Sequence, residues 1–354
     1  MATMTRTTPP RPVDVAGALP QLAPLARPAV RLHPRPGAPS RGDSSVGGPL
    51  LWPAGEPWPY CDGPHEPVGL AAPTSPEDVR LGRRIRVAAL SRPHGDPYYP
   101  SFTPEELETL ERIRAGRPWP EGPVAMVPVA QLYLRDVPLL HPPGQADVLQ
   151  VLWCPFDYGG DIPETVLYWR SAAEITSVLA DLPEPAAVRQ EWFLPEPCLL
   201  HPEQVTEYPN PLELSADLYE QVGRWSARQA GQAIPDSLDA LDEAAGPEGL
   251  YRNALSVAPG WKVGGWSHWG LTDPVPQICP ACDSVMVPLL TIDSTEWDDD
   301  TRSWIPYEDQ DRTEPSASCL DPVDPAMIQI GDLETLQLYA CPVDPGHPHT
   351  ARLQ

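Results

Sequence analysis

Short apolar runs, each bounded by proline or glycine, dominate the pattern of hydrophobic and polar positions along the chain. They cover 124–134, 148–153 and 165–169 in the first part of the chain, and 285–292 and 333–339 in the second. Runs of this length with such boundaries are typical of buried β-strands. Residues 29–33 alternate in polarity and predict one more short strand.

Two stretches carry the start signals of helices. Ser75 precedes a proline and two acidic residues, and Thr103 precedes a proline with Glu106 at the third helical position. A hydroxyl group caps the first backbone N–H groups, proline suits the first turn, and the glutamate completes a capping box. We also expect a short helix over 173–182 and an amphipathic helix over 215–228.

Three sequence blocks occur twice in the same order. They are Val-Gly-Gly at 46–48 and 263–265, Val-Pro-Val at 127–129 against Val-Pro-Leu at 287–289, and two segments that end in Cys-Pro at 149–155 and 336–342. Three blocks in one order, separated by inserts of different length, indicate an internal duplication. We therefore predict two related halves that pack on each other.

The predicted fold class is α+β and β-rich, with two homologous half-domains from internal duplication and with inserted helices. The 51 prolines favour short strands and rigid turns, because proline continues neither a helix nor a central strand. The expected domains are a disordered lead-in at 1–18, an N-terminal half with a helical insert at 19–230, a linker at 231–249, and a C-terminal half with a C-x2-C knuckle and an acidic insertion at 250–354.

Charge restricts the partners of the chain. It carries 49 acidic and 24 basic side chains, with a formal net charge of -25. This field repels phosphate backbones and anionic lipids, so it disfavours nucleic acid and membrane partners and favours a basic protein. No apolar segment has the length of a membrane span or of a signal peptide. Seven cysteines without a dense pattern argue against a secreted disulfide scaffold, so we expect a cytoplasmic protein.

The two glycine pairs each lie just before two tryptophans, and their spacing fits no phosphate-binding loop. One interpretation is a pair of structural turns with positive φ. The other is a groove that grips an extended peptide, to which Lys262, the only lysine, donates a hydrogen bond. The binding residues predicted for this groove are Gly47, Gly48, Trp52, Trp58, Lys262, Gly264, Gly265, Trp266 and Trp269.

Cysteines form a second constellation. Cys279 and Cys282 make a C-x2-C knuckle, and Cys341 with His347 or His349 completes the four donors of a tetrahedral zinc site. The metal ligands predicted are Cys279, Cys282, Cys341 and His347. Buried, reduced thiols are the alternative.

The first half repeats this arrangement in part. Cys61 and His65 follow its tryptophans, and Cys154 occupies the place that corresponds to Cys341. Cys198 and His201 form a further pair of metal-ligand types. The spacing of the C-x2-C knuckle and its partners is not that of a named zinc finger.

Catalytic motifs are not found in the sequence. Neither G-x-S-x-G, nor H-E-x-x-H, nor a distinctive carboxylate pair stands out, and no nucleophile has a recognisable base. The acidic and aromatic insertion at 293–311 is interpreted as a flexible surface loop or as a contact for a basic segment of another protein.

The residues around both glycine pairs resemble a known group of proteins. Residues 262–266, the knuckle and 287–293, together with 44–49 and Trp58, look like the bacterial YwqG-like family, a duplicated family of unknown function. The lysine-glycine-glycine and C-x2-C arrangement is also similar to the eukaryotic programmed cell death protein two group. The resemblance covers most of the chain from about residue 19.

This resemblance implies a duplicated, β-rich α+β fold and a protein-binding role. The eukaryotic relatives are chaperones for a basic ribosomal protein, and some bacterial ones are proposed to neutralise toxins. Three features depart from the family: Thr291 replaces the usual glutamine, Ser45 stands where the second half has Lys262, and the zinc finger inserted in the eukaryotic proteins is absent.

The leading hypothesis is a non-enzymatic protein-binding module, a chaperone-like holder of a basic protein segment. The alternatives are an immunity protein that neutralises a toxin and a metal-dependent enzyme that uses the knuckle and nearby acids. A solvent-open metal with three protein ligands would favour the enzyme. A structural zinc is the candidate cofactor.

Overall fold

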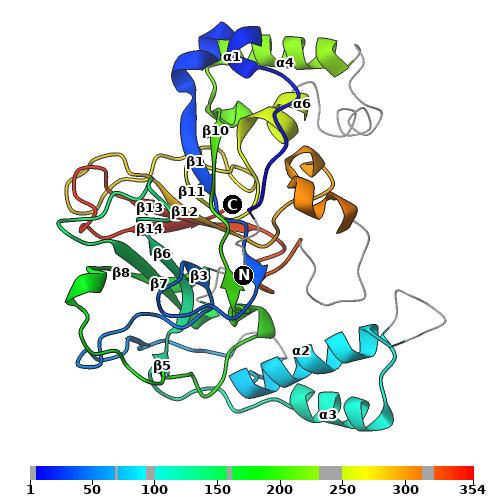
Figure 1. Cartoon of the computed structure of the whole chain (residues 1–354), viewed down its shortest axis with the longest axis vertical. Coiled ribbons are helices and arrows are strands. Elements are labelled where there is room, and N and C mark those ends of the chain that lie inside the picture. The colour runs from blue at the N-terminus through cyan, green and yellow to red at the C-terminus, as the bar shows by residue number, and fades with distance from the viewer. Residues whose placement is uncertain (1–4, 68–70, 93–99, 158–161, 231–248, 313–322) are drawn as a thin grey trace.

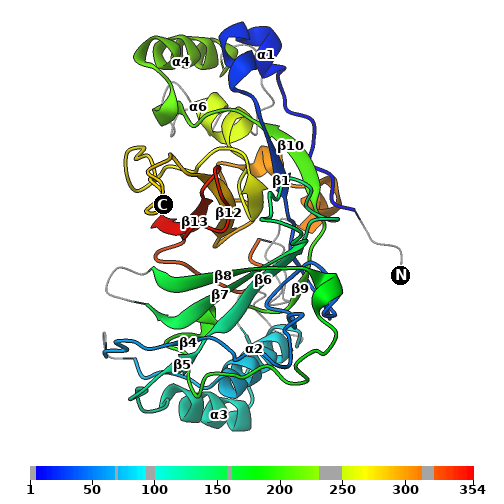
Figure 2. The same cartoon turned by 90° about the vertical axis from the view of Figure 1, so that its left-hand side faces the viewer.

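Two six-stranded antiparallel sheets form the centre of the molecule. Together with the helices around them, they make a mixed α+β fold. The computed structural model describes residues 5–67, 71–92, 100–157, 162–230, 249–312 and 323–354 (Figure 1). Helices lie at both ends: α1, α4 and α6 beyond one sheet, and α2 and α3 beyond the other (Figure 2). None of the described helices is long and apolar enough to cross a membrane.

The C-terminal sheet has the strand order β10-β1-β11-β12-β13-β14. Its strands are β10 (Glu203–Glu207), β1 (Arg27–Arg31), β11 (Lys262–Gly264), β12 (Val287–Asp293), β13 (Thr335–Ala340) and β14 (Thr350–Leu353). The N-terminal sheet has the order β2-β9-β3-β6-β7-β8. Its strands are β2 (Arg35–Pro36), β9 (Cys198–Leu199), β3 (Ser45–Val46), β6 (Val127–Tyr133), β7 (Val148–Asp157) and β8 (Pro163–Arg170), and a small separate sheet pairs β4 (Tyr60–Cys61) with β5 (Val124–Ala125).

The two sheets share the same plan from the third strand onward. In each, a strand that runs into a glycine pair lies next to a Val-Pro strand, and the strand after that contains a cysteine, Cys154 in β7, or directly precedes one, Cys341 after β13. The register shifts between Pro128 and Ala130 in the N-terminal sheet, and between Pro288 and Leu290 in the C-terminal sheet. The repeated blocks therefore occupy equivalent strand positions, while their common origin stays a prediction.

The expected division of the chain at 19–230 and 250–354 does not follow the sheets. Segment 27–36 contributes β1 to the C-terminal sheet and β2 to the N-terminal sheet, and segment 198–207 does the same with β9 and β10. The two segments pair antiparallel as a ribbon through both sheets. These two segments therefore join the two sheets. The apolar pattern along a segment does not reveal that its strands belong to two different sheets.

One hydrophobic core lies between the sheets. It includes Val129, Val151 and Trp153 of the N-terminal sheet together with Val263 and Leu338 of the C-terminal sheet, all of them buried. A second core, around Trp52 and Phe156, lies on the other side of the N-terminal sheet. Burial of apolar surface on the shared face holds the sheets together.

The helices are α1 (Val15–Ala18), α2 (Pro76–Leu90), α3 (Pro104–Arg114), α4 (Ala216–Ala230) and the short α6 (Gly249–Tyr251). Both expected start signals are confirmed, because Ser75 caps α2 and Thr103 forms a capping box with Glu106 in α3. The amphipathic helix expected over 215–228 is α4. The helix expected over 173–182 is wrong: only the single turn 172–174 is helical, and Val178 bridges to Pro53.

The lead-in expected to be disordered is ordered from Thr5 onward. Arg6 pairs with the buried Asp309 at 3.0 Å, and Thr8 donates to the Glu203 carboxylate at 2.9 Å. Val15 is buried in a third core with Trp225 of α4. Arg6 and Thr8 bind carboxylates that lie far away in the sequence. The composition of this segment alone therefore did not indicate that it is ordered. Of the linker expected at 231–249, all but Gly249 lies outside the described residues.

The acidic insertion differs from the surface loop that the sequence suggested. Glu296, Trp297, Trp304 and Asp309 are buried, whereas residues 298–300 are exposed. Asp309 pairs with Arg6 and Arg35, and the ring nitrogens of His33 lie 3.3 Å from Glu203 and 3.5 Å from Glu296. The buried Asp309 therefore pairs with one arginine of the lead-in and one of the ribbon, and the exposed positions of the insertion include 298–300 and Tyr307.

Candidate metal centre and neighbouring grooves

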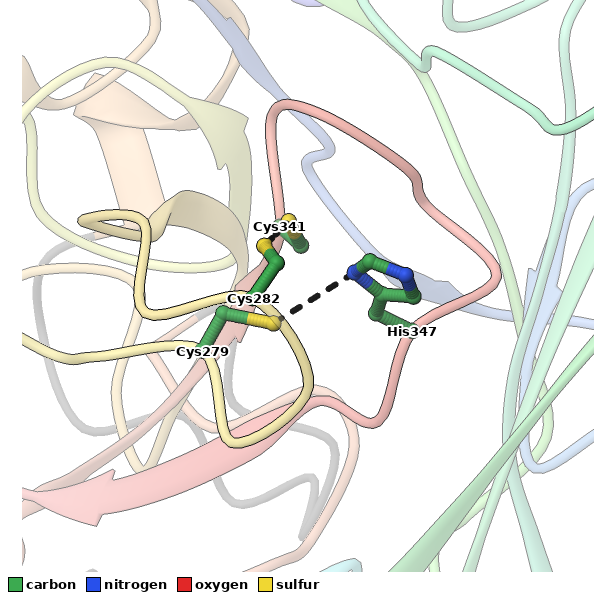
Figure 3. A group of neighbouring side chains, drawn as sticks. All are labelled: Cys279, Cys282, Cys341 and His347. Carbon is green, nitrogen blue, oxygen red and sulfur yellow. Dashed lines mark hydrogen bonds between the residues drawn. The ribbon is translucent and has the colours of Figure 1, made fainter.

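Four predicted ligands meet in one cluster, which we call the C-terminal cluster: Cys279, Cys282, Cys341 and His347. The first two lie in a tight hairpin, closed by a bridge between Ile278 and Val285 and by a 2.9 Å hydrogen bond from the Cys279 N–H to the Ser284 carbonyl. Cys341 directly follows β13, and His347 lies in the loop before β14 (Figure 3).

The distances within the C-terminal cluster fit a tetrahedral metal ion. Cys279 Sγ lies 3.5 Å from His347 Nδ1, Cys282 Sγ lies 3.5 Å from Cys341 Sγ, and all four ligand atoms lie within 4.8 Å of one another. Around one tetrahedral zinc, two sulfurs are about 3.8 Å apart, and a sulfur and a nitrogen about 3.6 Å. A disulfide requires about 2.05 Å, so these thiols are not bonded to each other.

The electrostatics of the cluster lower the pKa of two of its three thiols, Cys282 and Cys341. Hydrogen bonds from Ser284 lower the pKa of the exposed Cys282 to about 6. Burial acts to raise the pKa of Cys341, but hydrogen bonds from the Asp344 backbone and from His347 outweigh it and lower this pKa. The buried Cys279 has a raised pKa because of desolvation. A metal must displace the proton of that thiol to bind it.

The structure selects one of the two histidines that the sequence left open. His347 joins the cluster, whereas His349 Nε2 lies 2.8 Å from Thr165 Oγ1 of β8. Cys198 and His201 do not form a metal cluster within the described residues. The Cys198 thiol instead donates to the Pro325 carbonyl at 3.2 Å.

A second group, the N-terminal cluster, unites Cys61, His65 and Cys154. Cys61 ends β4, and Cys154 lies in β7 with its thiol 3.4 Å from His65 Nε2. Both cysteines are buried and His65 is half-buried. Burial raises the pKa of Cys154 and lowers that of His65. The partial repeat seen in the sequence is therefore a spatial cluster, and both clusters can hold a metal ion.

A groove next to the C-terminal cluster, which we call the Gly264 groove, lies between the two sheets. It encloses a cavity of about 370 Å³ and includes Gly264, Gly265, Pro288 and Cys341 in its walls. From the other side, Trp169 of β8 and two residues of the connection between β6 and β7, Leu139 and His141, also line it. Gly264 and Gly265 have φ of 72° and 73°, a conformation that favours glycine. A Cβ on Gly265 would lie 2.2 Å from Glu207 Oε2, so this position also lacks space.

The other glycine pair lines a separate cavity of about 590 Å³, the Gly47 groove. Its walls combine Gly47, Gly48 and Pro128 with Arg80, Arg83 and Arg84 of α2 and with two Leu-Pro-Glu-Pro segments at 182–185 and 194–197. Arg80 pairs with Glu184, and Arg83 pairs with Glu196 at 3.1 Å. The two glycine pairs therefore line two grooves, whereas the sequence had suggested one shared groove.

The tryptophans predicted to line the groove are mostly core residues. Trp52, Trp58 and Trp269 are buried, and the indole N–H of Trp58 donates to the Met126 carbonyl at 3.0 Å. Trp266 is half-buried, with the Arg27 guanidinium 3.4 Å above its ring and its indole N–H bound to the Leu25 carbonyl. Large rings next to glycine turns fill volume beneath them, so the peptide-lining role is wrong for the buried three.

Lys262 is also placed differently from the prediction. Its side chain is 1% exposed, and Nζ donates to both Glu207 carboxylate oxygens at 2.7 Å and to the Trp266 carbonyl at 2.8 Å. Burial lowers the pKa of Lys262, and the Glu207 carboxylate opposes this shift. All three donor positions are engaged within the protein, so Lys262 supports the glycine turn and does not reach a partner.

Sequence reasoning missed the residues that distant segments bring to these sites. Glu207, the partner of Lys262, lies 55 positions earlier in the chain. Trp169 of β8 and His141 of the connection between β6 and β7 also line the Gly264 groove. A buried lysine needs a carboxylate, but no strand was predicted around Glu207, so the sequence offered no signal that singled out this acid.

Comparisons with known proteins add no family. No family model matches the chain, and no curated protein matches it. The resemblance to the YwqG-like family therefore stays a prediction.

Proposed function

We propose that this protein is a non-enzymatic binding module that holds an extended segment of a basic protein in the Gly264 groove. The observation that carries the proposal is a groove between two sheets with walls of Val, Leu, Pro and Trp side chains and a glycine turn, Gly264 and Gly265, at its base. Concave apolar sites with a few polar groups are typical of ligand-binding surfaces. An extended segment suits the exposed strand ends and the glycine backbone of these walls.

Zinc at the C-terminal cluster supports the groove in this proposal. Three thiolates and one imidazole form the donor set of structural zinc sites. Cys341 is both a cluster member and a groove wall, and Pro342 and Pro345 of the following loop also line the groove. A metal bound to Cys341 and His347 fixes both ends of that loop, so it pre-orders the wall that contacts the client.

The charge of the chain provides the preference for a basic client. The net charge of -25 attracts cationic segments over long range and speeds their encounter, whereas the apolar groove supplies most of the affinity. The exposed acids at 298–300 contribute to this field. A cytoplasmic location is part of the proposal, because a reducing compartment keeps the six described cysteines as the free thiols that zinc requires.

The test uses two exposed valines that lie two positions apart. Val287 lines the Gly264 groove, whereas Val285 lies in the knuckle hairpin and is not among the groove walls. A displayed library of extended peptides is selected on the zinc-loaded full chain. We expect peptides with an apolar residue flanked by Arg or Lys. Val287→Trp fills the groove and should weaken their binding at least about tenfold, equal to about 1.4 kcal/mol.

Val285→Trp is the matched control and should bind as the wild type does. Raised salt should slow association with the selected peptides, because long-range attraction is screened. No enrichment of any peptide sequence, or equal loss of binding in the two tryptophan variants, would contradict the groove as the binding site.

A further inference from the structure

The N-terminal cluster has ligand types and positions that parallel those of the C-terminal cluster. Cys154 follows Trp153, which pairs with Val127, and Cys341 follows Ala340, which pairs with Val287. Each of these cysteines therefore lies just beyond the bulged Val-Pro pairing of its sheet. The two thiols occupy the same place in two separate sheets.

The remaining ligands also come from equivalent segments. In each half a pair of ligand residues follows the glycine turn and its tryptophans: Cys61 with His65 in one, Cys279 with Cys282 in the other. In the C-terminal half the last ligand, His347, precedes the final strand β14. Its counterpart is a residue at the start of β8, the final strand of the N-terminal sheet.

Glu164 occupies that position in the chain, and because its carboxylate lies outside the group of three ligand atoms that are all within 4.8 Å of one another, it must turn toward an ion to bind it. Glu164 is the second residue of β8, and its Oε2 lies 3.2 Å from Cys61 Sγ. Cys154 Sγ lies 3.4 Å from His65 Nε2 on the other side of the cluster. Ligands of a tetrahedral zinc with one sulfur and one lighter atom lie about 3.6 Å apart, so both contacts have the required scale.

We propose that Cys61, His65, Cys154 and Glu164 form a second metal site that binds zinc. Two thiolates and one imidazole favour zinc over calcium and magnesium, which prefer oxygen ligands. A fourth protein ligand closes the coordination sphere, so the site is structural. It ties β4 and the following loop to the strands β7 and β8. This inference does not depend on the client or on the Gly264 groove.

Metal analysis of the full chain, purified without a tag and under reducing conditions, tests the proposal. We expect two zinc ions per chain in the wild type. Cys282→Ser, at an exposed position of the C-terminal cluster, should leave one, and His65→Asn, at a half-buried position, should also leave one. The double variant should hold none. Circular dichroism of each variant checks that the fold is retained.

Cobalt substitution identifies the ligands that hold the second ion. In the Cys282→Ser background, Co²⁺ should give a tetrahedral spectrum with a thiolate charge-transfer band, and His65→Asn should abolish it. Glu164→Gln should weaken Co²⁺ affinity at least about tenfold while the chain stays folded. One zinc per wild-type chain that His65→Asn does not change, or a Cys61–Cys154 disulfide in its place, would overturn the proposal.

If Glu164→Gln leaves the Co²⁺ affinity unchanged and a water molecule is the fourth ligand, the proposal that Glu164 closes the coordination sphere is contradicted. That result would instead favour an open, three-ligand metal. None of these results alters the peptide-binding test, because that test uses residues of the other sheet.

Discussion

The two sheets share a backbone plan but differ in side-chain chemistry at equivalent positions. Both place a glycine turn, a bulged Val-Pro strand and a cysteine in the same order. Where the C-terminal sheet has Lys262 opposite Thr291, the N-terminal sheet has Ser45 opposite Gln131. The backbone plan is thus compatible with a buried ion pair in one sheet and with neutral polar residues in the other.

The buried polar side chains make different contacts in the two sheets. Lys262 and Glu207 connect β11 to the shared ribbon, whereas the amides of Gln131 and Gln150 bind each other at 2.9 Å within the N-terminal sheet. The Gly47 groove receives arginines from the helical insert, whereas the Gly264 groove receives Trp169 of β8 and Leu139 of the connection between β6 and β7. The repeated strands form the scaffold, and segments outside the repeated blocks line the two grooves differently.

The largest effect on the free energy of unfolding is expected at the buried Lys262–Glu207 pair, in contrast to Ser45 at the equivalent position of the other sheet. Glu207→Gln leaves the buried Lys262 ammonium without its counter-charge and should lower the free energy of unfolding by about 3–5 kcal/mol. Ser45→Ala should cost less than about 1 kcal/mol, because the Ser45 hydroxyl has no hydrogen-bond partner among the described residues. Urea unfolding of both variants measures the difference, and equal losses would contradict the distinct roles.

Metal removal should have the next largest effect. Zinc present at a hundredfold excess over its dissociation constant stabilises the folded state by about 2.7 kcal/mol per site. Chelation should therefore lower the melting temperature of the wild type. Cys282→Ser should reduce this drop, because Cys282 is exposed and its substitution removes a ligand without a buried cavity. A chelator that shifts neither protein would argue against metal in the C-terminal cluster.

The next effect, smaller per pH unit, should separate the two sheets by pH. Burial raises the pKa of Asp293 to about 7, whereas an unfolded aspartate titrates near about 3.9. The folded protein therefore keeps a proton that the unfolded chain releases in this window. Stability contributed by this group falls as pH rises from about 4 to about 7, by up to about 1.4 kcal/mol per pH unit.

Asp293→Asn should flatten this slope in unfolding experiments over the same pH range. Tyr133 occupies the equivalent position in β6, and burial raises its pKa from an already alkaline value. Tyr133→Phe removes a 2.7 Å hydrogen bond to the Arg41 carbonyl and should cost about 1 kcal/mol at every pH tested. A parallel pH slope in wild type and Asp293→Asn would contradict the assignment to Asp293.

The smallest effect concerns the helical insert that only the N-terminal half carries. Thr103 caps α3, which has no buried residue and contacts mainly α2. Thr103→Ala should cost about 1 kcal/mol or less of helix stability. Amide exchange should rise in α3 while the sheets stay protected. Faster exchange across β6 and β7 would instead show that the insert supports the sheet.

The sequence predicted local features well and distant contacts poorly. The caps of α2 and α3 and most strands were readable, because capping and apolar runs act over a few residues. The C-terminal cluster was found because cysteine and histidine carry a distinctive chemistry. The burial of Lys262 was not, since its carboxylate partner belongs to a ribbon segment shared by both sheets.

Site-specific photo-crosslinking in native lysate tests the central claim most directly, that the metal-supported Gly264 groove is where a basic protein segment binds. A photoreactive residue at Val287 should give one crosslinked basic protein, and the same residue at Val285 should give none. Chelation should abolish the product from position 287. Equal crosslinking from both positions, or a product from 287 that survives metal removal, would contradict the account.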